Sequence, residues 1–283
     1  MAVALPLFGA FVLGLGSRRW LRRHFALLFR LQFGIGLGTL AVLSGWSFEL
    51  SGRNVAALGV LLVAQLTAVG VASRVFRAHD DGPLLAFAMF GNPTFWSLPI
   101  AAVAFGPEAA VFLVVYDMLT QARIALGVKL LRRSAPVVPS ARSAFADYAP
   151  TAGAVVGVLL GRFVAAPEVI AAAVTVLGIA MSAMAMLLLG VAWPREWAGR
   201  VSAAVAARGL AMHFTIFPSV LAAATVLGVA LPGSAWIFAF GPLPISLVSF
   251  ARLYGYSTRT AATGLALSVA ISLAILPVVL SLT

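Results

Sequence analysis

The sequence predicts an all-α integral membrane protein, with about ten transmembrane helices in a single domain over residues 1–283. Composition is the first reason: 62% of the residues are hydrophobic and only 10% are charged, with a mean hydropathy of +1.07. A soluble domain carries about 25% charged residues, so this chain lacks the polar groups needed for a water-facing surface. The second reason is that apolar stretches near the roughly 20 residues needed to cross a bilayer fill nearly the whole chain.

Each apolar stretch is an expected helix, and short gaps rich in Arg, Pro and Gly separate them. The first stretch is the shortest, and the fourth and ninth contain prolines in their interiors. The expected spans are residues 3–16, 25–45, 54–74, 83–105, 108–129, 148–165, 168–192, 203–229, 233–253 and 259–281.

The distribution of basic residues supports this count. Of the 19 Lys and Arg residues, only Arg53 and Arg162 fall on one side of the expected membrane, and the other 17 fall on the opposite side. Cytoplasmic loops carry the excess of Lys and Arg, so we expect the basic side in the cytoplasm and both termini outside. This predicts a multi-pass protein of the cytoplasmic (inner) membrane. The net charge of +11 then belongs to loops beside the lipid bilayer, and we expect no nucleic-acid partner.

The longest polar stretch divides the chain into two halves of five spans. It ends in a Pro-, Ser- and Arg-rich linker at about 134–147, between a first repeat of about 1–133 and a second of about 148–283. Because five is odd, the halves have opposite orientations in the membrane. That is the inverted-repeat plan of many secondary transporters.

The fourth and ninth spans, which occupy the same position in each half, are interrupted by prolines. The fourth contains Asn92, Pro93, Ser97 and Pro99 within the sequence GNPTFWSLPI, and the ninth contains Pro242, Pro244 and Ser246 within GPLPIS. A proline lacks a backbone donor and clashes with the preceding turn, so both spans are expected to be discontinuous helices. Paired interruptions of this kind point to a transporter binding site. The alternative is a pair of proline kinks that serve packing alone.

Broken backbone in lipid leaves unpaired N–H and C=O groups, and it is tolerated only where protein or a watery cavity satisfies them. The N-termini of half-helices carry partial positive charge and free N–H groups that suit an anion. The seven residues named above are therefore the expected solute-binding set.

Further polar residues fall near the middle of expected spans. Asp117, with Thr120 and Gln121 on nearby turns, is the candidate for coupling to Na⁺ or H⁺, because an ionisable group at mid-bilayer is costly and commonly functional. An internal hydrogen bond or a pair with Arg123 is the alternative. Gln65 and His213 are weaker candidates, since such groups also bond between helices.

No metal or cofactor is expected. The chain has no cysteine, and its three histidines are isolated, so no metal-ligand spacing occurs.

Around the interrupted spans the sequence resembles the auxin efflux carrier family, which belongs with the bile acid and arsenite transporters. In the fourth span Asn92 and Pro99 match the family pattern, while Ser97 replaces a glycine; the stretch 105–109 is also family-like. The ninth span is similar in Pro242, Ala251 and Tyr254-Gly255, the last in Ser268, Ser272 and Pro277, and the seventh in Gly178 and 187–190. Pro93 and Pro244 depart from the pattern as additional prolines.

The resemblance implies external termini and two crossing broken helices, four and nine. It also implies a scaffold of spans one, two, six and seven, against which spans three to five and eight to ten move. Substrates in the family are typically organic anions such as auxin or dicarboxylates.

Together these observations predict a non-enzymatic secondary transporter, a permease for a small anionic organic solute that works by alternating access. Its partners are the solute and the bilayer, and a homodimer is a possible assembly. The alternatives are a membrane-embedded enzyme acting on lipids, which would need clustered acids or histidines, and a channel, which would need a polar pore-lining stripe. A sensor or partner subunit would need a second chain.

Overall fold

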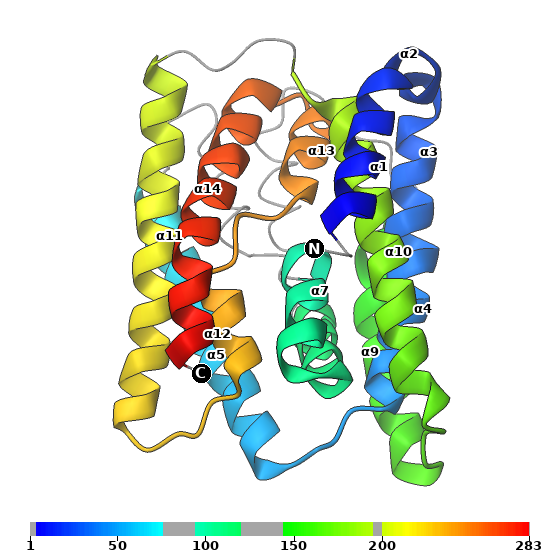
Figure 1. Cartoon of the computed structure of the whole chain (residues 1–283), viewed down its shortest axis with the longest axis vertical. Helices are drawn as coiled ribbons and strands as arrows, with labels where there is room; N and C mark the ends of the chain where they lie inside the picture. The colour runs from blue at the N-terminus through cyan, green and yellow to red at the C-terminus, as the bar shows by residue number, and fades with distance from the viewer. Residues whose placement is uncertain (1–3, 76–93, 120–143, 195–199, 283) are drawn as a thin grey trace.

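The computed structural model describes residues 4–75, 94–119, 144–194 and 200–282, and every regular element in these ranges is helical (Figure 1). Five helical stretches are long and apolar enough to cross a membrane: Arg18–Trp46, Gly52–Ala72, Val169–Ala192, Ala203–Val226 and Thr258–Ser281. Shorter apolar helices lie at Pro6–Gly16, Phe95–Phe105 and Ala149–Phe163. An all-helical chain of this composition suits a membrane-embedded protein.

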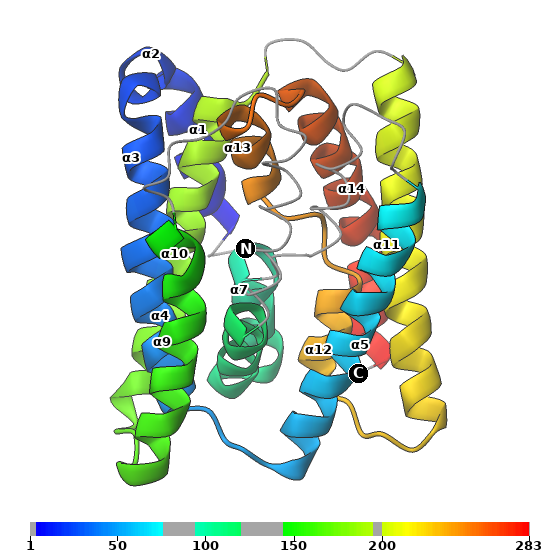
Figure 2. The same cartoon turned by 180° about the vertical axis from the view of Figure 1, so that it is seen from behind.

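One side of the molecule is a group of closely packed helices, drawn on the right of Figure 1 and on the left of Figure 2. It contains α1 (Ala4–Gly16), α9 (Ala144–Phe163) and α10 (Val169–Ala192). The remaining member is a continuous rod made of α2 (Arg18–Leu21), η1 (Arg22–His24), α3 (Phe25–Arg30), the π-helix η2 (Leu31–Gly36) and α4 (Leu37–Trp46).

The other side contains α5 (Gly52–Val75), α11 (Arg200–Val226) and α14 (Thr258–Leu282), with the two short helices α12 (Gly233–Ala239) and α13 (Ser246–Leu253). Between the two groups lies α7 (Thr94–Phe105), followed by a helix over residues 107–119. Every side chain from Ala110 to Met118 is buried, so this last helix lies in the centre of the protein.

Wherever the chain is described, the expected span boundaries agree with the helices to within a few residues, except that the helical rod of the second span begins at Arg18 rather than at residue 25. The fourth and fifth spans are described only over 94–105 and 107–119. The ninth span is two helices rather than one. Helix α9 already begins at Ala144, within the linker that was predicted over 134–147. The rest of that linker, 134–143, lies outside the described residues.

Glycines set the closest helix contacts. Gly153, Gly157 and Gly161 repeat every fourth residue and form one face of α9. A Cβ on Gly153 would lie 2.7 Å from the Gly38 carbonyl oxygen of α4, and one on Gly161 would lie 2.7 Å from that of Trp46. In lipid there is little hydrophobic drive between helices, so small residues that let backbones approach determine which helices associate.

A second close crossing joins α1 to α10. A Cβ on Gly14 would meet the Leu187 carbonyl, and one on Gly190 would meet the Phe11 carbonyl. The glycine contacts thus pair the first expected span with the seventh, and the second with the sixth.

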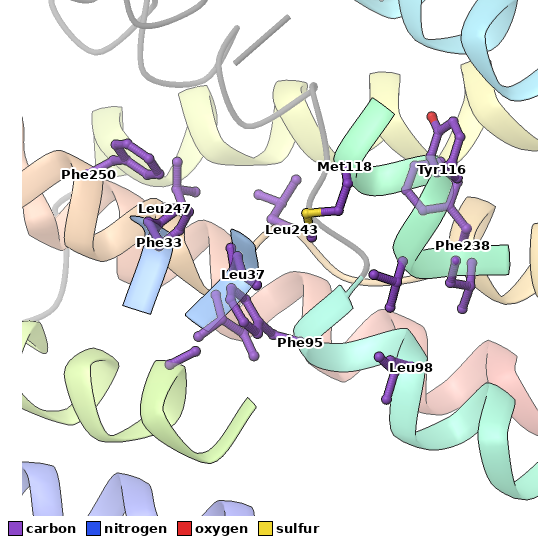
Figure 3. Packing of buried hydrophobic residues seen from close by; sticks show 14 of the residues in the cluster. Phe33, Leu37, Phe95, Leu98, Tyr116, Met118, Phe238, Leu243, Leu247 and Phe250 are labelled. Carbon is purple, nitrogen blue, oxygen red and sulfur yellow. The ribbon is translucent and has the colours of Figure 1, made fainter. Parts of the chain in front are cut away.

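The two groups meet through aromatic side chains rather than glycines. Phe250 of α13 contacts Phe29 and Phe33 edge-on, with ring centroids 5.2 and 5.7 Å apart. Phe33 also contacts Phe95 of α7, at 6.2 Å (Figure 3). At one end of this interface the Arg252 guanidinium donates to the Val191 carbonyl oxygen at 2.9 Å, which links α13 to the end of α10.

Candidate functional site

The ninth span is broken inside the protein. Helix α12 ends at Ala239, and helical structure resumes only at Ser246; we call residues 240–245 the break. Pro242 and Pro244 cannot donate to a helix, and each also disfavours helical geometry in the residue before it. Two such prolines in alternate positions therefore stop the helix for a whole turn, as the sequence predicts.

The backbone of the break is buried, and neighbouring helices satisfy it. The His213 side chain of α11, 1% exposed, contacts the Gly241 carbonyl oxygen through Nε2 at 3.0 Å. The Leu243 N–H donates to Ser268 Oγ of α14 at 3.1 Å, and that hydroxyl donates to the Leu265 carbonyl at 2.7 Å. These bonds replace part of the helical hydrogen bonding that the prolines remove, which is the condition for broken backbone at this depth.

The break touches the fourth span. A Cβ placed on Gly241 would lie 3.1 Å from Ser97 Oγ of α7, so the serine side chain lies directly against the glycine backbone. Ser97 is 1% exposed, and among the described residues its hydroxyl has no hydrogen-bond partner. We call Ser97, Gly241 and His213 the break contact.

The polar atoms of the break contact are able to bind a ligand. A carbonyl only accepts, so Nε2 of His213 carries the proton in this bond, and Nδ1 is then an acceptor in the neutral ring. Nδ1 has no partner in the described part of the chain. Buried polar atoms are normally paired, so the unpartnered hydroxyl and the unpartnered ring nitrogen are two exceptions that lie beside the same broken helix.

The structure distributes the other predicted site residues unequally. Pro242 and Pro244 lie in the break, and Ser246, 5% exposed, is the first residue of α13. Pro99 lies within α7, which continues through it to Phe105. The prediction that Pro99 interrupts the helix was therefore wrong. This proline is the sixth of the twelve residues of α7, so it removes one hydrogen bond from the helix interior without ending the helix. Asn92, Pro93, Thr120 and Gln121 lie outside the described residues.

Asp117 and Gln65 are both buried in the protein. Asp117 is 0% exposed and Gln65 1%. The Tyr116 hydroxyl donates to the Gln65 side-chain oxygen, which joins helix 107–119 to α5.

Aromatic rings connect Tyr116, the hydrogen-bond partner of Gln65, to the break contact. The Tyr116 ring lies edge-on to Phe238 of α12, with centroids 4.9 Å apart, and Phe238 contacts Phe217 at 5.3 Å. Phe217 in turn contacts His213 at 5.1 Å. Figure 3 shows Tyr116 and Phe238 close together, and Leu243 of the break in the same buried cluster.

Two residues of this region were not assigned to the site from the sequence. Ser268 was identified only through the family resemblance. Its hydroxyl in the middle of an apolar span was the one feature of the sequence that could have indicated a polar contact there. Tyr116 was missed, because nothing in a one-dimensional pattern distinguishes it from an interface tyrosine. No three His, Asp or Glu side chains gather into a metal-binding group in the described ranges.

No protein-family model and no curated protein matches this chain. The resemblance to the auxin efflux carriers therefore rests on the residues quoted above.

The Ser268 bond provides a test of the break. We expect Ser268→Ala to lower the free energy of unfolding by about 1–3 kcal/mol, because the Leu243 N–H is left buried without a partner. Reversible unfolding in mixed detergent micelles measures the change. The matched control is Ser281→Ala on the same helix, whose exposed hydroxyl only bonds its own turn, and which should change stability by less than about 0.5 kcal/mol. Equal effects of the two substitutions would show that the break does not depend on Ser268.

Proposed function

We propose that the protein is a secondary transporter that moves a small anionic organic solute by alternating access. The observation that carries this proposal is the break contact, where unpartnered polar atoms of the fourth span and of α11 meet the broken backbone of the ninth. Unpaired polar side-chain groups at mid-depth are costly, and they are kept where a ligand or ion uses them.

The chemistry of the break contact favours an anion. The Ser97 hydroxyl can donate, and α13 begins directly after the break, so the positive end of its helix dipole lies there. No described carboxylate belongs to the break contact. A carboxylate-bearing solute is therefore better suited than a cation to this place.

The family proposal also gains support at Ser97. The auxin efflux carrier pattern has glycine here, which suggests that the two spans must approach closely. In this chain the small residue at the contact is Gly241 of the ninth span. The fourth and ninth spans therefore still approach closely, and Ser97 adds a hydroxyl at their contact. We propose on this basis that the chain is related to these permeases.

The pairing of helices supports ten spans in two inverted repeats, 1–133 and 148–283. Exchanging each span with its counterpart five positions on converts the α1–α10 pair into the α4–α9 pair, and both are close glycine crossings. The same exchange converts the α7–α10 contact, made by Leu98 on Gly178, into the contact of Phe29 and Phe33 with α13. Inverted repeats of this kind place the substrate between the halves.

The same contacts support a division into scaffold and moving unit. Helices α1, α4, α9 and α10 meet at backbone distance through glycines, whereas the interface toward α13 is formed by aromatic rings. Glycine crossings hold one geometry, and ring contacts tolerate sliding better. We propose that α1–α4, α9 and α10 form the scaffold, and that the remaining helices move against it.

Transport by purified protein in liposomes tests the break contact. We expect Ser97→Ala and Gly241→Ala each to lower the initial rate of organic anion uptake about tenfold, the first by removing a hydrogen bond to the solute and the second by forcing α7 from the break. The control is Gly59→Ala, because nothing lies within 4 Å of its added Cβ. Folded Ser97→Ala and Gly241→Ala proteins that transport at the rate of the control would eliminate the proposed site.

The orientation can be tested directly because the chain has no cysteine. We propose that the arginine-rich end, where α1 leads into α2, faces the cytoplasm, and that the α11–α12 connection lies outside. A membrane-impermeant thiol reagent applied to intact cells should label Ala230→Cys and spare Ser17→Cys. The reverse labelling would invert the proposed topology.

Asp117 is the proposed coupling residue, for Na⁺ or H⁺. It is fully buried beside Tyr116, and a carboxylate at mid-bilayer is an expected part of an ion or proton pathway. In liposomes, we expect Asp117→Asn to abolish the acceleration of uptake by an imposed sodium or proton gradient. Unchanged dependence on both gradients in the variant would exclude a coupling role.

A further inference from the structure

A cavity of about 460 Å³ opens at the end of the molecule opposite α2. Four segments meet there: the connection between α4 and α5, the end of α7, the start of helix 107–119 and the start of α12. Its lining residues, which we call the vestibule, are Ser47, Phe48, Glu49, Ser51, Arg53, Asn54, Phe105, Glu108, Ala109, Val111, Phe112, Pro232, Gly233 and Ser234. The volume lies in the range of small-molecule sites.

The vestibule contains charges of both signs that do not neutralise each other. Glu49 and Glu108 contribute carboxylates, and Arg53 contributes a guanidinium. No ion pair joins them in the described chain; the only hydrogen bond of the Arg53 side chain there is to the Leu231 carbonyl, at 3.4 Å. Each charged group therefore retains capacity to pair with a ligand of opposite charge.

The inner wall of the vestibule combines apolar surface with one unsatisfied hydroxyl. Phe48 and Phe112, 9% and 3% exposed, are largely buried and form the apolar part of the lining. Ser234 is 1% exposed, and its hydroxyl has no partner among the described residues. Buried hydroxyls are normally satisfied, so this orphan is a second indication of a ligand, independent of the charges.

The vestibule and the break contact lie at opposite ends of the same two helices. Helix α7 runs from Ser97 in the break contact to Phe105 in the vestibule, and α12 runs from Ser234 to the break. The Phe105 ring lies against Gly233, where an added Cβ would be 2.5 Å from the ring. The vestibule therefore lies at the opposite end of α7 and α12 from the break contact.

We propose that the vestibule binds a small solute carrying both an ammonium and a carboxylate group on an apolar chain, as in a hydrophobic amino acid. Arg53 pairs with the carboxylate, Glu49 and Glu108 pair with the ammonium group, and Phe48 and Phe112 contact the chain. A dianion would meet two carboxylates against one guanidinium, and a simple amine would leave Arg53 unpaired. The role of this site as a transport entrance rests on the proposed function, whereas binding itself does not.

Three probes with the same branched apolar chain separate the two charges. L-Leucine carries both groups, 4-methylpentanoate lacks the ammonium group, and 3-methylbutylamine lacks the carboxylate. Titration calorimetry on the purified full-length protein should give leucine binding about tenfold tighter than either single-charge probe, as expected for one charge-assisted hydrogen bond lost. Absence of leucine binding, or equal binding of leucine and 4-methylpentanoate, would overturn the proposal.

Matched variants locate the binding. Arg53→Gln, Glu49→Gln and Glu108→Gln should each weaken leucine binding about tenfold and remove the preference over one single-charge probe. Because Glu108 lies in the first turn of its helix, Glu49→Gln tests the ammonium pairing independently of helix stability. The controls are Arg162→Gln and Glu168→Gln, exposed charges near the same end but outside the vestibule, which should bind leucine as the parent does.

The experiment also separates this proposal from the proposed function. Ser97→Ala should bind leucine normally, even though its transport is impaired. Loss of leucine binding in Ser97→Ala but not in Arg53→Gln would place the ligand at the break contact and overturn the vestibule proposal. Normal transport by Ser97→Ala, with leucine binding still dependent on Arg53, would remove the proposed transport site and leave the vestibule intact.

Discussion

The satisfied backbone of the break is the constraint on which the rest of the structure depends. Gly241 and Leu243 present a carbonyl and an N–H that no helix can use, and His213 and Ser268 bond them from two other helices. A break of this kind is stable only if α11 and α14 flank it closely, so the positions of these long helices follow from the need to enclose it. With the backbone held from behind, the open face of Gly241 is left for Ser97.

Away from the break, the helices pack through two kinds of contact. Where α4 meets α9 and α1 meets α10, glycines bring backbones together and dispersion forces act over the whole crossing. Toward α13 the contact passes instead through the rings of Phe29, Phe33 and Phe250, which can change partners without losing a hydrogen bond, and through one polar link, from Arg252 to the Val191 carbonyl. The polar groups that do need fixed partners are concentrated around the break. The molecule therefore separates rigid crossings, adaptable ring contacts and a small polar centre.

Much of this architecture could be read from the sequence, because the decisive signals are local. Pro242 and Pro244 act on their own turn, so the interruption of the ninth span was predictable, as were the boundaries of α10 and α14 from hydropathy. Pro99 was read as a break because a proline in a helix interior commonly ends or kinks the helix, whereas α7 continues through it. The meeting of Ser97 with Gly241, the bond from Ser268 and the vestibule depend on segments far apart in the chain. Loop charges such as Glu49 and Arg53 show no periodicity, so sequence patterns do not predict that they converge.

The π-helix η2 has a consequence for how one rod can serve two neighbours. The Leu37 N–H bonds the carbonyl of Gln32, five residues back, so this turn contains one residue more than an α-helical turn. Since each α-helical residue advances about 100° around the axis, the extra residue offsets the angular register of α3 from that of α4. In an uninterrupted α-helix Phe29 and Gly45, sixteen residues apart, would lie about 160° apart around the axis, and the extra residue changes this angle by about 100°. A single added residue thereby sets the angle between the face that meets α13 and the face that meets α9.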